Sequence, residues 1–307
     1  MLVTHIVSIW GKGGVEKFIE TFPATSQKTI IGKDFKALKN IQNVDEETLY
    51  LFHSPPYFLS ILFLIICGKA NKIGIFIHND LHHLYSFPKK IVIYPWLAFL
   101  SVMSVKVLYL SSCNDFLRSF CKSPVKMRYI SETLSNSKVQ KQNRRKIIFV
   151  SRQAEDKRLD RAIKIFQSLN VKNVTFEVWG HGYDEIKNDN DWTKVNFCGY
   201  TESLDAVYDS NKILLITSEY ESGPLTAIEA LQRGMPVIST RVGIFKHLNN
   251  DSRFGYRVFD KDEEAKSHLE YFLNQQSSEE DPRDFLQTIT YNKQEFFDEL
   301  MKNFKHR

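Results

Sequence analysis

Two glutamates, Glu221 and Glu229, stand with seven residues between them where an apolar run meets a Gly-Pro turn. The run at residues 213–216 is short and followed by turn residues, which predicts a buried strand. A helix is expected over residues 225–233, and Pro224 suits its first position because a missing N–H costs nothing there. A helix N-terminus beside the carboxyl end of a strand offers free N–H groups and a positive dipole, which favour a bound phosphate. The two acids could therefore flank a phosphorylated ligand, or form an acid/base pair of the kind found in glycosidases.

Two cations, Arg152 and Lys157, follow the apolar run at residues 147–150, which predicts another strand. The carboxyl edge of a parallel sheet is where such proteins bind ligands. At that edge Arg152 could form a two-pronged hydrogen bond to a diphosphate, and Lys157 could add a point charge. The alternative is a solvated loop in which both cations pair with Glu155 and Asp156.

Two pairs of glycines also follow expected strands. Gly180 and Gly182 come after the run at residues 175–179, where they could let the backbone approach a ligand or simply form a tight turn. Gly13 and Gly14 come after the first apolar run and are candidates for a loop near a substrate. This segment lacks the complete glycine patterns of nicotinamide dehydrogenases and P-loop ATPases, so neither class is indicated.

His78 opens a segment, residues 78–83, that holds three histidines and an aspartate. Clustered histidine and aspartate are metal ligands in many proteins. No second ligand group stands at a useful spacing, however, and the segment instead favours a single His78 that donates a hydrogen bond to a sugar hydroxyl or a phosphate. Residues 189–191 (Asp-Asn-Asp) fit the D-x-D pattern of metal-dependent sugar transferases. They lie in a polar segment rather than after an apolar strand, which favours a solvated loop, and we expect no metal.

The composition is that of a globular chain of 307 residues, with 43% hydrophobic and 25% charged residues, long enough for two domains. Four cysteines show no metal or redox spacing and no secretory signal is evident, which predicts reduced thiols in the cytoplasm. The formal net charge of +5 is modest and no aromatic–basic motif is present, so the sequence does not indicate nucleic-acid binding.

The first 140 residues are basic, with 16 Lys and Arg against 9 Asp and Glu, and they hold two apolar stretches at residues 57–67 and 91–110. The first stretch is shorter than the roughly 20 apolar residues that a membrane span needs, and Pro95 and Lys106 interrupt the second. Both stretches could be buried core elements. Alternatively, they could form a basic and aromatic surface that rests on an anionic membrane. The sequence thus allows peripheral contact with the cytoplasmic face of the inner membrane and predicts no transmembrane span.

Apolar runs alternate with helical patterns along the chain, which predicts an α/β fold with two doubly wound parallel sheets. Residues 1–140 are expected to form an N-terminal domain and residues 141–285 a second domain, with a polar, basic linker at residues 135–145. Residues 286–307 are expected to form a terminal helix that packs back toward the N-terminal domain. Strands are expected at residues 3–10, 48–52, 73–77, 106–110, 147–150, 175–179, 195–197, 213–216 and 237–239, with helices at residues 15–22, 159–169, 204–208 and 225–233.

The order of motifs in the second half resembles the family-4 glycosyltransferases, retaining enzymes of the GT-B fold. The resemblance spans residues 147–245, about a third of the chain, and is weaker at Gly13-Gly14-Val15-Glu16 and Ile77-His78. It is carried by Phe149-Val150-Ser151-Arg152 with Lys157, by Val178-Trp179-Gly180-His181-Gly182, by Val195-Asn196-Phe197-Cys198-Gly199-Tyr200, and by Glu221-Ser222-Gly223-Pro224-Leu225-Thr226-Ala227-Ile228-Glu229.

The resemblance implies a nucleotide-sugar donor, most commonly a UDP-sugar, held by the second domain, and an acceptor held by the first across a cleft. It implies that Arg152 and Lys157 bind the donor diphosphate, that Glu229 grips the ribose, and that Glu221 and His78 lie near the transferred sugar. The remaining donor-binding positions that it implies are glycines and helix-start residues together with one aromatic residue, namely Gly13, Gly14, Gly180, Gly182, Tyr200, Gly223, Pro224, Leu225 and Thr226. No metal is required, because fixed cations and N–H groups can stabilise the leaving diphosphate.

The activity that this resemblance implies is a hexosyl or N-acetylhexosaminyl transfer to a glycan or lipid-linked glycan in bacterial capsule, O-antigen or lipopolysaccharide synthesis. One alternative is a UDP-sugar epimerase or another GT-B relative. A second alternative is a catalytically silent GT-B subunit that binds a partner transferase or the membrane. The intact set of Arg152, Lys157, Glu221 and Glu229 favours an active enzyme.

Overall fold

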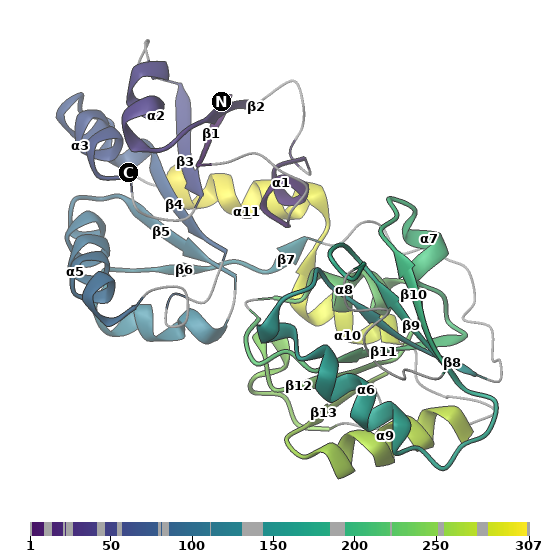
Figure 1. Cartoon of the computed structure of the whole chain (residues 1–307). Coiled ribbons are helices and arrows are strands. Elements are labelled where there is room, and N and C mark those ends of the chain that lie inside the picture. Colours follow the sequence, from purple (N-terminus) through teal and green to yellow (C-terminus); the bar gives the residue numbers. More distant parts are fainter. Residues whose placement is uncertain are drawn as a thin grey trace. The chain divides into compact units, whose positions relative to one another are not determined.

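The computed structural model describes residues 2–8, 14–20, 22, 27–41, 47–53, 57–78, 81, 86–110, 112–130, 144–184, 194–221, 223–250, 255–274 and 282–305. The chain forms two compact units (Figure 1). The first unit holds residues 1–132 and 291–307, and the second holds residues 133–290. The sequence prediction placed these boundaries near residues 140 and 285.

The first unit is built on a sheet of six parallel strands in the order β2-β1-β3-β4-β5-β6. Its four central strands are mostly apolar and buried, as is typical of parallel sheets, whereas the two edge strands are partly exposed. The strands are β1 (Leu2–Val7), β2 (Gln27–Ile31), β3 (Thr48–His53), β4 (Ile73–Ile77), β5 (Lys106–Tyr109) and β6 (Val125–Lys126), and the helices are α1 (Gly14–Glu20), α2 (Asp34–Asn40), α3 (Phe58–Ile66), α5 (Phe87–Val102) and α11 (Lys293–Lys305).

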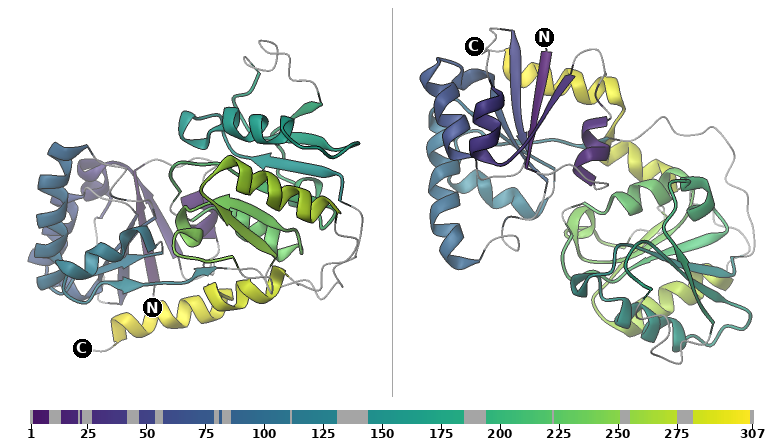
Figure 2. Two further views of the ribbon diagram at one scale, coloured as in Figure 1. Left: turned by 90° about the horizontal axis from the view of Figure 1, so that it is seen from below. Right: turned by 45° about the horizontal axis from the view of Figure 1, so that its top comes forward.

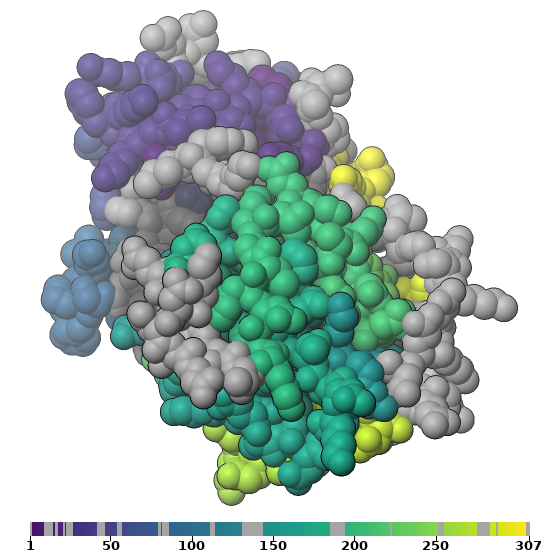
Figure 3. Space-filling view, turned by 45° about the vertical axis from the view of Figure 1, so that its right-hand side comes forward, coloured from purple at the N-terminus to yellow at the C-terminus, as the bar shows by residue number. Residues whose placement is uncertain are grey.

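The second unit repeats this plan, with six parallel strands in the order β10-β9-β8-β11-β12-β13. Its core lies between the sheet and helices α6 and α9, where Phe166 and Phe272 are buried against strand residues such as Phe176. In space-filling form, the teal and green residues of this unit make one continuous surface (Figure 3). The strands are β8 (Lys146–Val150), β9 (Thr175–Trp179), β10 (Val195–Gly199), β11 (Lys212–Ile216), β12 (Val237–Thr240) and β13 (Tyr256–Phe259), and the helices are α6 (Leu159–Gln167), α7 (Leu204–Val207), α8 (Leu225–Gln232), α9 (Asp262–Asn274) and α10 (Pro282–Ile289).

The prediction of two doubly wound parallel sheets is confirmed. The end of the chain forms a pair of helices, because the short strand β14 (Thr290–Tyr291) separates α10 from α11 and pairs with β7 (Tyr129–Ile130). Helix α11, yellow in Figure 2, belongs to the first unit. In this unit Phe296 packs edge-on against Phe18 and Phe22. Residues 131–143, which include most of the expected linker, lie outside the described part of the chain.

The sheet order of the second unit locates the point where a ligand would bind. The chain runs from β8 outward to β9 and β10, and then returns to β11 on the other side of β8. In open α/β sheets, ligands bind outside the carboxyl ends of the strands at such a switch point. The loops after β8 and β11 carry Arg152, Lys157 and Glu221, so the topology brings the predicted site residues to this edge.

Candidate active site

Backbone hydrogen bonds join the loops that follow β8, β9 and β11 at the carboxyl edge of the second sheet. The Gln153 N–H donates to the carbonyl of His181 over 2.8 Å, which links the β8 loop to the β9 loop. The Glu219 N–H donates to the carbonyl of Asp156, also over 2.8 Å, which links the β11 loop to the β8 loop. These loops are therefore held as one layer, and the side chains on them have defined neighbours.

Lys157 lies at the centre of this layer and is fully engaged. Its Nζ lies 2.7 Å from Glu221 Oε1, 3.1 Å from Asp156 Oδ2 and 3.4 Å from the carbonyl of Tyr220. The Lys157 side chain is 14% exposed and that of Glu221 is 22% exposed. Because an ammonium has three N–H donors, each of these acceptors can take one. A phosphate that binds Lys157 must therefore displace one of them. The ion pair with Asp156 is a contact that the alternative from the sequence, a loop in which the cations pair with Glu155 and Asp156, expected.

The turn that presents Lys157 is held in an unusual backbone conformation. Arg158, which precedes α6, has a φ of 53° in the left-handed region, which costs energy for a residue with a Cβ. The Thr217 hydroxyl lies 3.0 Å from the carbonyl of Lys157 and 2.8 Å from that of Arg158, and the Arg158 guanidinium lies 2.6 Å from Glu219. Contacts from the β11 loop therefore stabilise the strained turn and fix the backbone on both sides of the Lys157 side chain.

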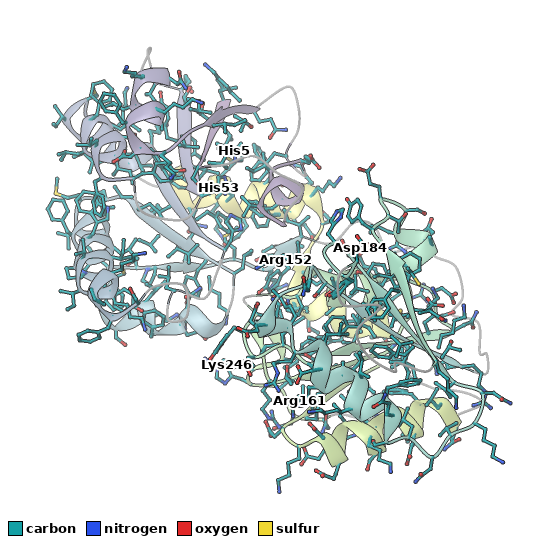
Figure 4. The ribbon with its side chains drawn as sticks, viewed as in Figure 1. His5, His53, Arg152, Arg161, Asp184 and Lys246 are labelled. Atoms are coloured by element: carbon teal, nitrogen blue, oxygen red, sulfur yellow. The ribbon has the colours of Figure 1, made fainter. Side chains whose placement is uncertain are left out.

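Arg152 differs from Lys157 because it is open. Its side chain is exposed at the end of β8 (Figure 4), and within the described residues its guanidinium has no hydrogen-bond or ion-pair partner. Arg161, on α6, is instead paired with Asp262 at 2.6 Å. Of the two predicted phosphate-binding cations, Arg152 can accept an anion without breaking an existing contact.

Gly180 is needed for the close approach of the β8 and β9 loops. Its φ is 136°, and a Cβ at this position would lie 1.8 Å from the carbonyl oxygen of Ser151. Gly182 has a φ of 91° and approaches Gln153, where a Cβ would lie 3.0 Å from the side chain. Both glycines therefore shape the backbone that leads to Arg152.

Tyr200 lies beside this turn. Its ring stacks on that of His181 with the ring centroids 4.0 Å apart, and it remains 42% exposed. An exposed aromatic pair at a strand edge offers a flat surface against which a base or a sugar ring could pack. The contact links the loop after β10 to the loop after β9.

The start of α8 supplies unpaired N–H groups at the same edge. Pro224 precedes the helix as its cap, one position earlier than the sequence predicted. The N–H groups of Leu225 and Thr226 have no acceptor within the described residues, as expected at the first positions of a helix. Gly243, which the sequence did not indicate, packs so closely that a Cβ there would lie 2.8 Å from Pro224 and 3.1 Å from Gly223. The α8 start is thereby fixed against the loop after β12.

Glu229 lies inside α8 and is held by a buried tyrosine. The Tyr208 hydroxyl donates a 2.8 Å hydrogen bond to Glu229 Oε2, and Tyr208 is 3% exposed. Burial and the neighbouring carboxylate raise the pKa of Tyr208 well above its usual value, so the hydroxyl remains a donor at neutral pH. One carboxylate oxygen is thus oriented by Tyr208, while the half-buried side chain keeps acceptor capacity for a ligand.

His78 belongs to a hydrogen-bonded chain of three histidines in the first unit. His5 Nδ1 lies 2.9 Å from His53 Nε2, and His53 Nδ1 lies 2.7 Å from His78 Nε2. His5 on β1 lies opposite Leu51 on β3, so His53 stands two residues beyond the partner of His5. His53 in turn lies opposite Phe76 on β4, so His78 stands two residues beyond the partner of His53. The histidine chain therefore runs diagonally across one face of β1 and β3 to the end of β4. His5 and His53 are labelled in Figure 4.

The three histidines are neutral at physiological pH. Burial lowers the pKa of His5 to about 4, and burial with the neighbouring His5 lowers the pKa of His78 to about 3. Burial, followed by the charges of His78 and His5, lowers the pKa of His53 well below its usual value. The ring of Phe18 lies edge-on to those of His53 and His78, which adds to the apolar surroundings. Among the described residues, no three His, Cys, Asp or Glu side chains are grouped so that they could hold a metal ion.

Other predicted positions are only partly described. Gly14 begins α1, whereas Gly13 lies outside the described residues, as do residues 79–80, 82–83 and 185–193 with their Asp-Asn-Asp segment. Sequence reasoning missed His5, His53, Tyr208 and Thr217, which support the predicted side chains from distant positions in the chain. Only the placement of His5 and His53 on neighbouring expected strands could have indicated any of them.

The profile of the family described as "Glycosyl transferases group 1" matches residues 131–288, which is just over half of the chain and includes the whole layer of loops around Lys157. The chain belongs to this family. A Klebsiella pneumoniae protein described as an uncharacterized 41.2 kDa protein in the cps region is 28% identical over 136 residues, which cover 42% of this chain and 38% of that protein. The poly(glycerol-phosphate) alpha-glucosyltransferase of Bacillus subtilis (strain 168) is 32% identical over 103 residues, which cover 31% of this chain and 15% of that protein. The matched segments thus span well under half the length of these relatives.

Solved structures of glycosyltransferases share the fold over most of this group 1 family member. TarM superposes with a TM-score of 0.67 at 17% identity and covers 87% of this chain and 57% of its own. The lipopolysaccharide outer core galactosyltransferase WaaB has a TM-score of 0.62 at 15% identity over 99% of this chain and 98% of its own. Anabaena Alr3699/HepE, solved with UDP and glucose, has a TM-score of 0.64 at 12% identity over the full length of both chains. The GT-B fold class predicted from the sequence is confirmed.

Proposed function

We propose that the chain is a retaining glycosyltransferase that moves a hexose or N-acetylhexosamine from a nucleotide-diphosphate sugar to a glycan or lipid-linked glycan. The family assignment supports transfer of a sugar, and relatives described in a cps region, in poly(glycerol-phosphate) glucosylation and in lipopolysaccharide synthesis support a bacterial surface polymer as the product. A structural neighbour solved with UDP-glucose supports a UDP-sugar as the donor.

In this proposal the donor diphosphate binds at the switch point of the second sheet. Arg152 engages it first, because its guanidinium is open, and Lys157 then exchanges one of its three acceptors for a phosphate oxygen. The N–H groups of Gly223, Leu225 and Thr226 face the phosphate and sugar. Glu229, oriented by Tyr208, accepts hydrogen bonds from the ribose hydroxyls. The glycine turn at Gly180 and Gly182, the ring of Tyr200 and the start of α8 at Pro224 shape the rest of the donor pocket.

The chemical step breaks the bond between the anomeric carbon and the diphosphate oxygen. Negative charge grows on the departing diphosphate, and Arg152, Lys157 and the α8 amides stabilise that charge in place of a metal ion. The acceptor hydroxyl attacks from the same face, and a diphosphate oxygen takes its proton, so the configuration at the anomeric carbon is retained. We expect Glu221 and His78 to contact hydroxyls of the sugar, and Gly13 and Gly14 to lie near the donor phosphate and the acceptor.

The observation that carries this proposal is the Lys157–Glu221 pair beside the open Arg152, at the carboxyl edge of β8 and β11. It is tested by measuring hydrolysis and binding over a panel of UDP-, GDP- and ADP-sugars, with and without a metal chelator. We expect one nucleotide class to bind and turn over, with the chelator leaving the rate unchanged. Failure of every donor to bind or react would overturn the proposal in favour of a catalytically silent subunit, and loss of turnover with the chelator would overturn the metal-independent step.

We further propose that the protein acts in the cytoplasm, in peripheral contact with the cytoplasmic face of the inner membrane, where lipid-linked acceptors are made. The charge of the N-terminal residues supports this contact. The first 140 residues are basic, with 16 Lys and Arg against 9 Asp and Glu. Within the described residues, no helix is long and apolar enough to cross a bilayer.

A further inference from the structure

Helix α3 in the first unit is apolar on both sides. Its sequence, Phe58–Ile66, contains no charged residue. Ile61 and Leu64 are buried in the core of the unit, as expected for one face of a helix that covers a sheet. The opposite face carries a second apolar stripe at the i, i+3, i+4, i+7 spacing of a single helix face. That stripe consists of the exposed residues Leu59, Leu62, Phe63 and Ile66.

Helix α5 has the same organisation over a greater length. Ile93, Leu97 and Leu100 are buried in the same core as α3. The opposite side of the helix is exposed and apolar, with Phe87 75% exposed and Ile91 60% exposed. It continues through Val92, Phe99 and Val102 to Met103 just beyond the helix end. A second apolar stripe that faces solvent is not needed to hold either helix on the sheet.

The two stripes belong to one surface. The rings of Phe58 on α3 and Trp96 on α5 are in contact, with their centroids 5.1 Å apart. In both views the two helices lie side by side on the same side of the first unit (Figures 1 and 2). More than half of the large apolar side chains that are exposed among the described residues lie on these two helices. A concentration of this kind marks an interaction surface rather than ordinary apolar exposure. We call it the α3/α5 face.

The charges that flank the α3/α5 face are positive. Residues 57–110 contain five lysines and a single acid, Asp80, which lies outside the described residues. Lys69 follows α3, and Lys89 and Lys90 lie in the first turn of α5. None of these three lysines forms an ion pair within the described part of the chain. Asp34, on the neighbouring helix α2, is occupied at the N-terminus of α3, where its carboxylate accepts the N–H groups of Leu59 and Ser60 at 2.7 and 2.8 Å.

We propose that the α3/α5 face docks on an anionic lipid surface. The exposed side chains of α3 and α5 would enter the boundary between head groups and acyl chains, and the flanking lysines would contact the lipid phosphates. A lipid surface fits better than a protein groove, because the apolar residues stand on the convex side of two helices and unpaired lysines border them. The inference specifies the membrane contact of the proposed function, and it does not depend on the transfer of a sugar.

The test is sedimentation of the full chain with vesicles of phosphatidylcholine alone or of phosphatidylethanolamine with phosphatidylglycerol. We expect binding to the phosphatidylglycerol vesicles to be at least about tenfold stronger than to phosphatidylcholine, and to weaken in high salt. Equal binding to both, or no binding to either, would overturn the proposal.

Variants then assign the binding to the α3/α5 face. Ile66→Glu with Ile91→Glu replaces two side chains that are 76% and 60% exposed, so no core contact is lost. The double variant is expected to bind phosphatidylglycerol vesicles about tenfold more weakly or worse. The matched control is Tyr271→Glu on α9 of the second unit, an exposed apolar position where the new carboxylate still faces Arg257. The control is expected to bind like the unchanged chain, and equal losses in the control and the double variant would contradict the assignment.

Two further measurements distinguish lipid docking from self-association of the chain and from a general loss of folding. If the lipid-free chain sediments as a dimer that Ile66→Glu with Ile91→Glu converts to a monomer, the face is covered by a second copy and the lipid proposal is wrong. Nucleotide affinity of the double variant, measured by calorimetry, is expected to be unchanged because the substitutions lie in the first unit. For the unchanged chain, failure to bind vesicles with intact nucleotide binding would refute the docking surface alone. Vesicle binding without nucleotide binding would refute the proposed donor site alone.

Discussion

The polar side chains near the carboxyl edges of the two sheets differ in charge: those of the first sheet are neutral, and those of the second are ionised. In the first unit, the buried His5 and His53 and the half-buried His78 form a hydrogen-bonded chain in which burial lowers each pKa, so that all three rings are neutral. In the second unit, Lys157 is ion-paired with Glu221 at 2.7 Å, and Arg152 is open. The comparison teaches that one parallel-sheet plan can present either uncharged hydrogen-bonding groups or fixed charges at the same position.

The difference follows from how each set of side chains is held. The histidines lie on the strands among phenylalanine rings, where a charge would lose its hydration. The cations of the second unit lie on loops beyond the strands, where solvent and acceptors are within reach. Neutral donors and acceptors suit the hydroxyls of a sugar, whereas fixed cations suit a diphosphate. The comparison therefore supports the proposed division between sugar contacts and donor phosphate contacts.

Gly180→Ala is expected to have the largest effect on the carboxyl edge of the second sheet, although it changes no charge. A Cβ at Gly180 would lie 1.8 Å from the Ser151 carbonyl at a φ of 136°. The β8 and β9 loops must then separate, and we expect a loss of about 3–5 kcal/mol in the free energy of unfolding, measured by urea denaturation. Gly199→Ala is the matched control. That glycine has a φ of 72° but nothing within 4 Å of the added Cβ, so a loss of only about 1 kcal/mol is expected. Equal losses in the two variants would contradict the close approach at Gly180.

Arg152→Ala removes the open cation and is expected to lower turnover by about 10²–10³-fold, with a smaller change in donor affinity, because its charge acts mainly on the departing diphosphate. Steady-state kinetics with the donor identified in the panel separates the two effects. Lys164→Ala removes an equally exposed cation from α6 in the same unit and is expected to leave turnover unchanged. Loss of affinity without loss of turnover in Arg152→Ala would assign this residue to binding alone.

The sequence predicted the strands of both sheets well, because they are apolar runs closed by turn residues. It also predicted β11 and α8, because a strand, a Gly-Pro turn and a helix follow one another without interruption. It missed β2 (Gln27–Ile31), β6 (Val125–Lys126) and β13 (Tyr256–Phe259), which are short and contain polar residues. In β13 the buried Arg257 is accommodated by the rings of Tyr271 and Phe272, each 5.2 Å from its guanidinium carbon. Because the rings that accommodate Arg257 lie on another element, α9, the residues of β13 do not form the apolar run by which a buried strand is recognised in a sequence.

The supporting contacts of the site could not be predicted for the same reason. His5 and His53 are 48 residues apart in the chain, and only the strand register places them 2.9 Å apart. Thr217 and Tyr208 act through hydrogen bonds to the β8 loop and to α8, and neither belongs to a motif. Local patterns thus identified the residues at the carboxyl edge of the second sheet, whereas the residues that hold them depend on tertiary packing.

The neutral histidine chain predicts a loss of stability in mild acid. The pKa of His5 falls from 6.5 to about 4 on folding, so below pH 6.5 the unfolded chain binds a proton that the folded chain does not. The free energy of unfolding is therefore expected to decrease as the pH falls from 6.5 to about 4, by about 3 kcal/mol from His5 alone. His53 and His78 act in the same direction. Urea denaturation at a series of pH values measures this slope. His5→Phe should make the slope shallower, whereas His247→Ala, which removes an exposed histidine, should leave it unchanged.

Glu229→Gln is expected to have the smallest effect, and it tests whether the second unit binds the donor through its ribose as well as through its phosphates. The amide oxygen can still accept the Tyr208 hydroxyl, which lies 2.8 Å from the carboxylate, so the fold of α8 should be retained. The substitution replaces the charge-assisted hydrogen bond between a ribose hydroxyl and the Glu229 carboxylate by a weaker bond to an uncharged amide. We therefore expect nucleoside diphosphate binding, measured by calorimetry, to weaken about tenfold. Tyr208→Phe keeps the carboxylate but removes the group that orients it, and a loss of only about threefold is expected. If Glu229→Gln leaves the affinity for every nucleoside diphosphate unchanged, Glu229 does not contact the ribose, and the charged edge of the second unit binds the donor through its phosphates alone.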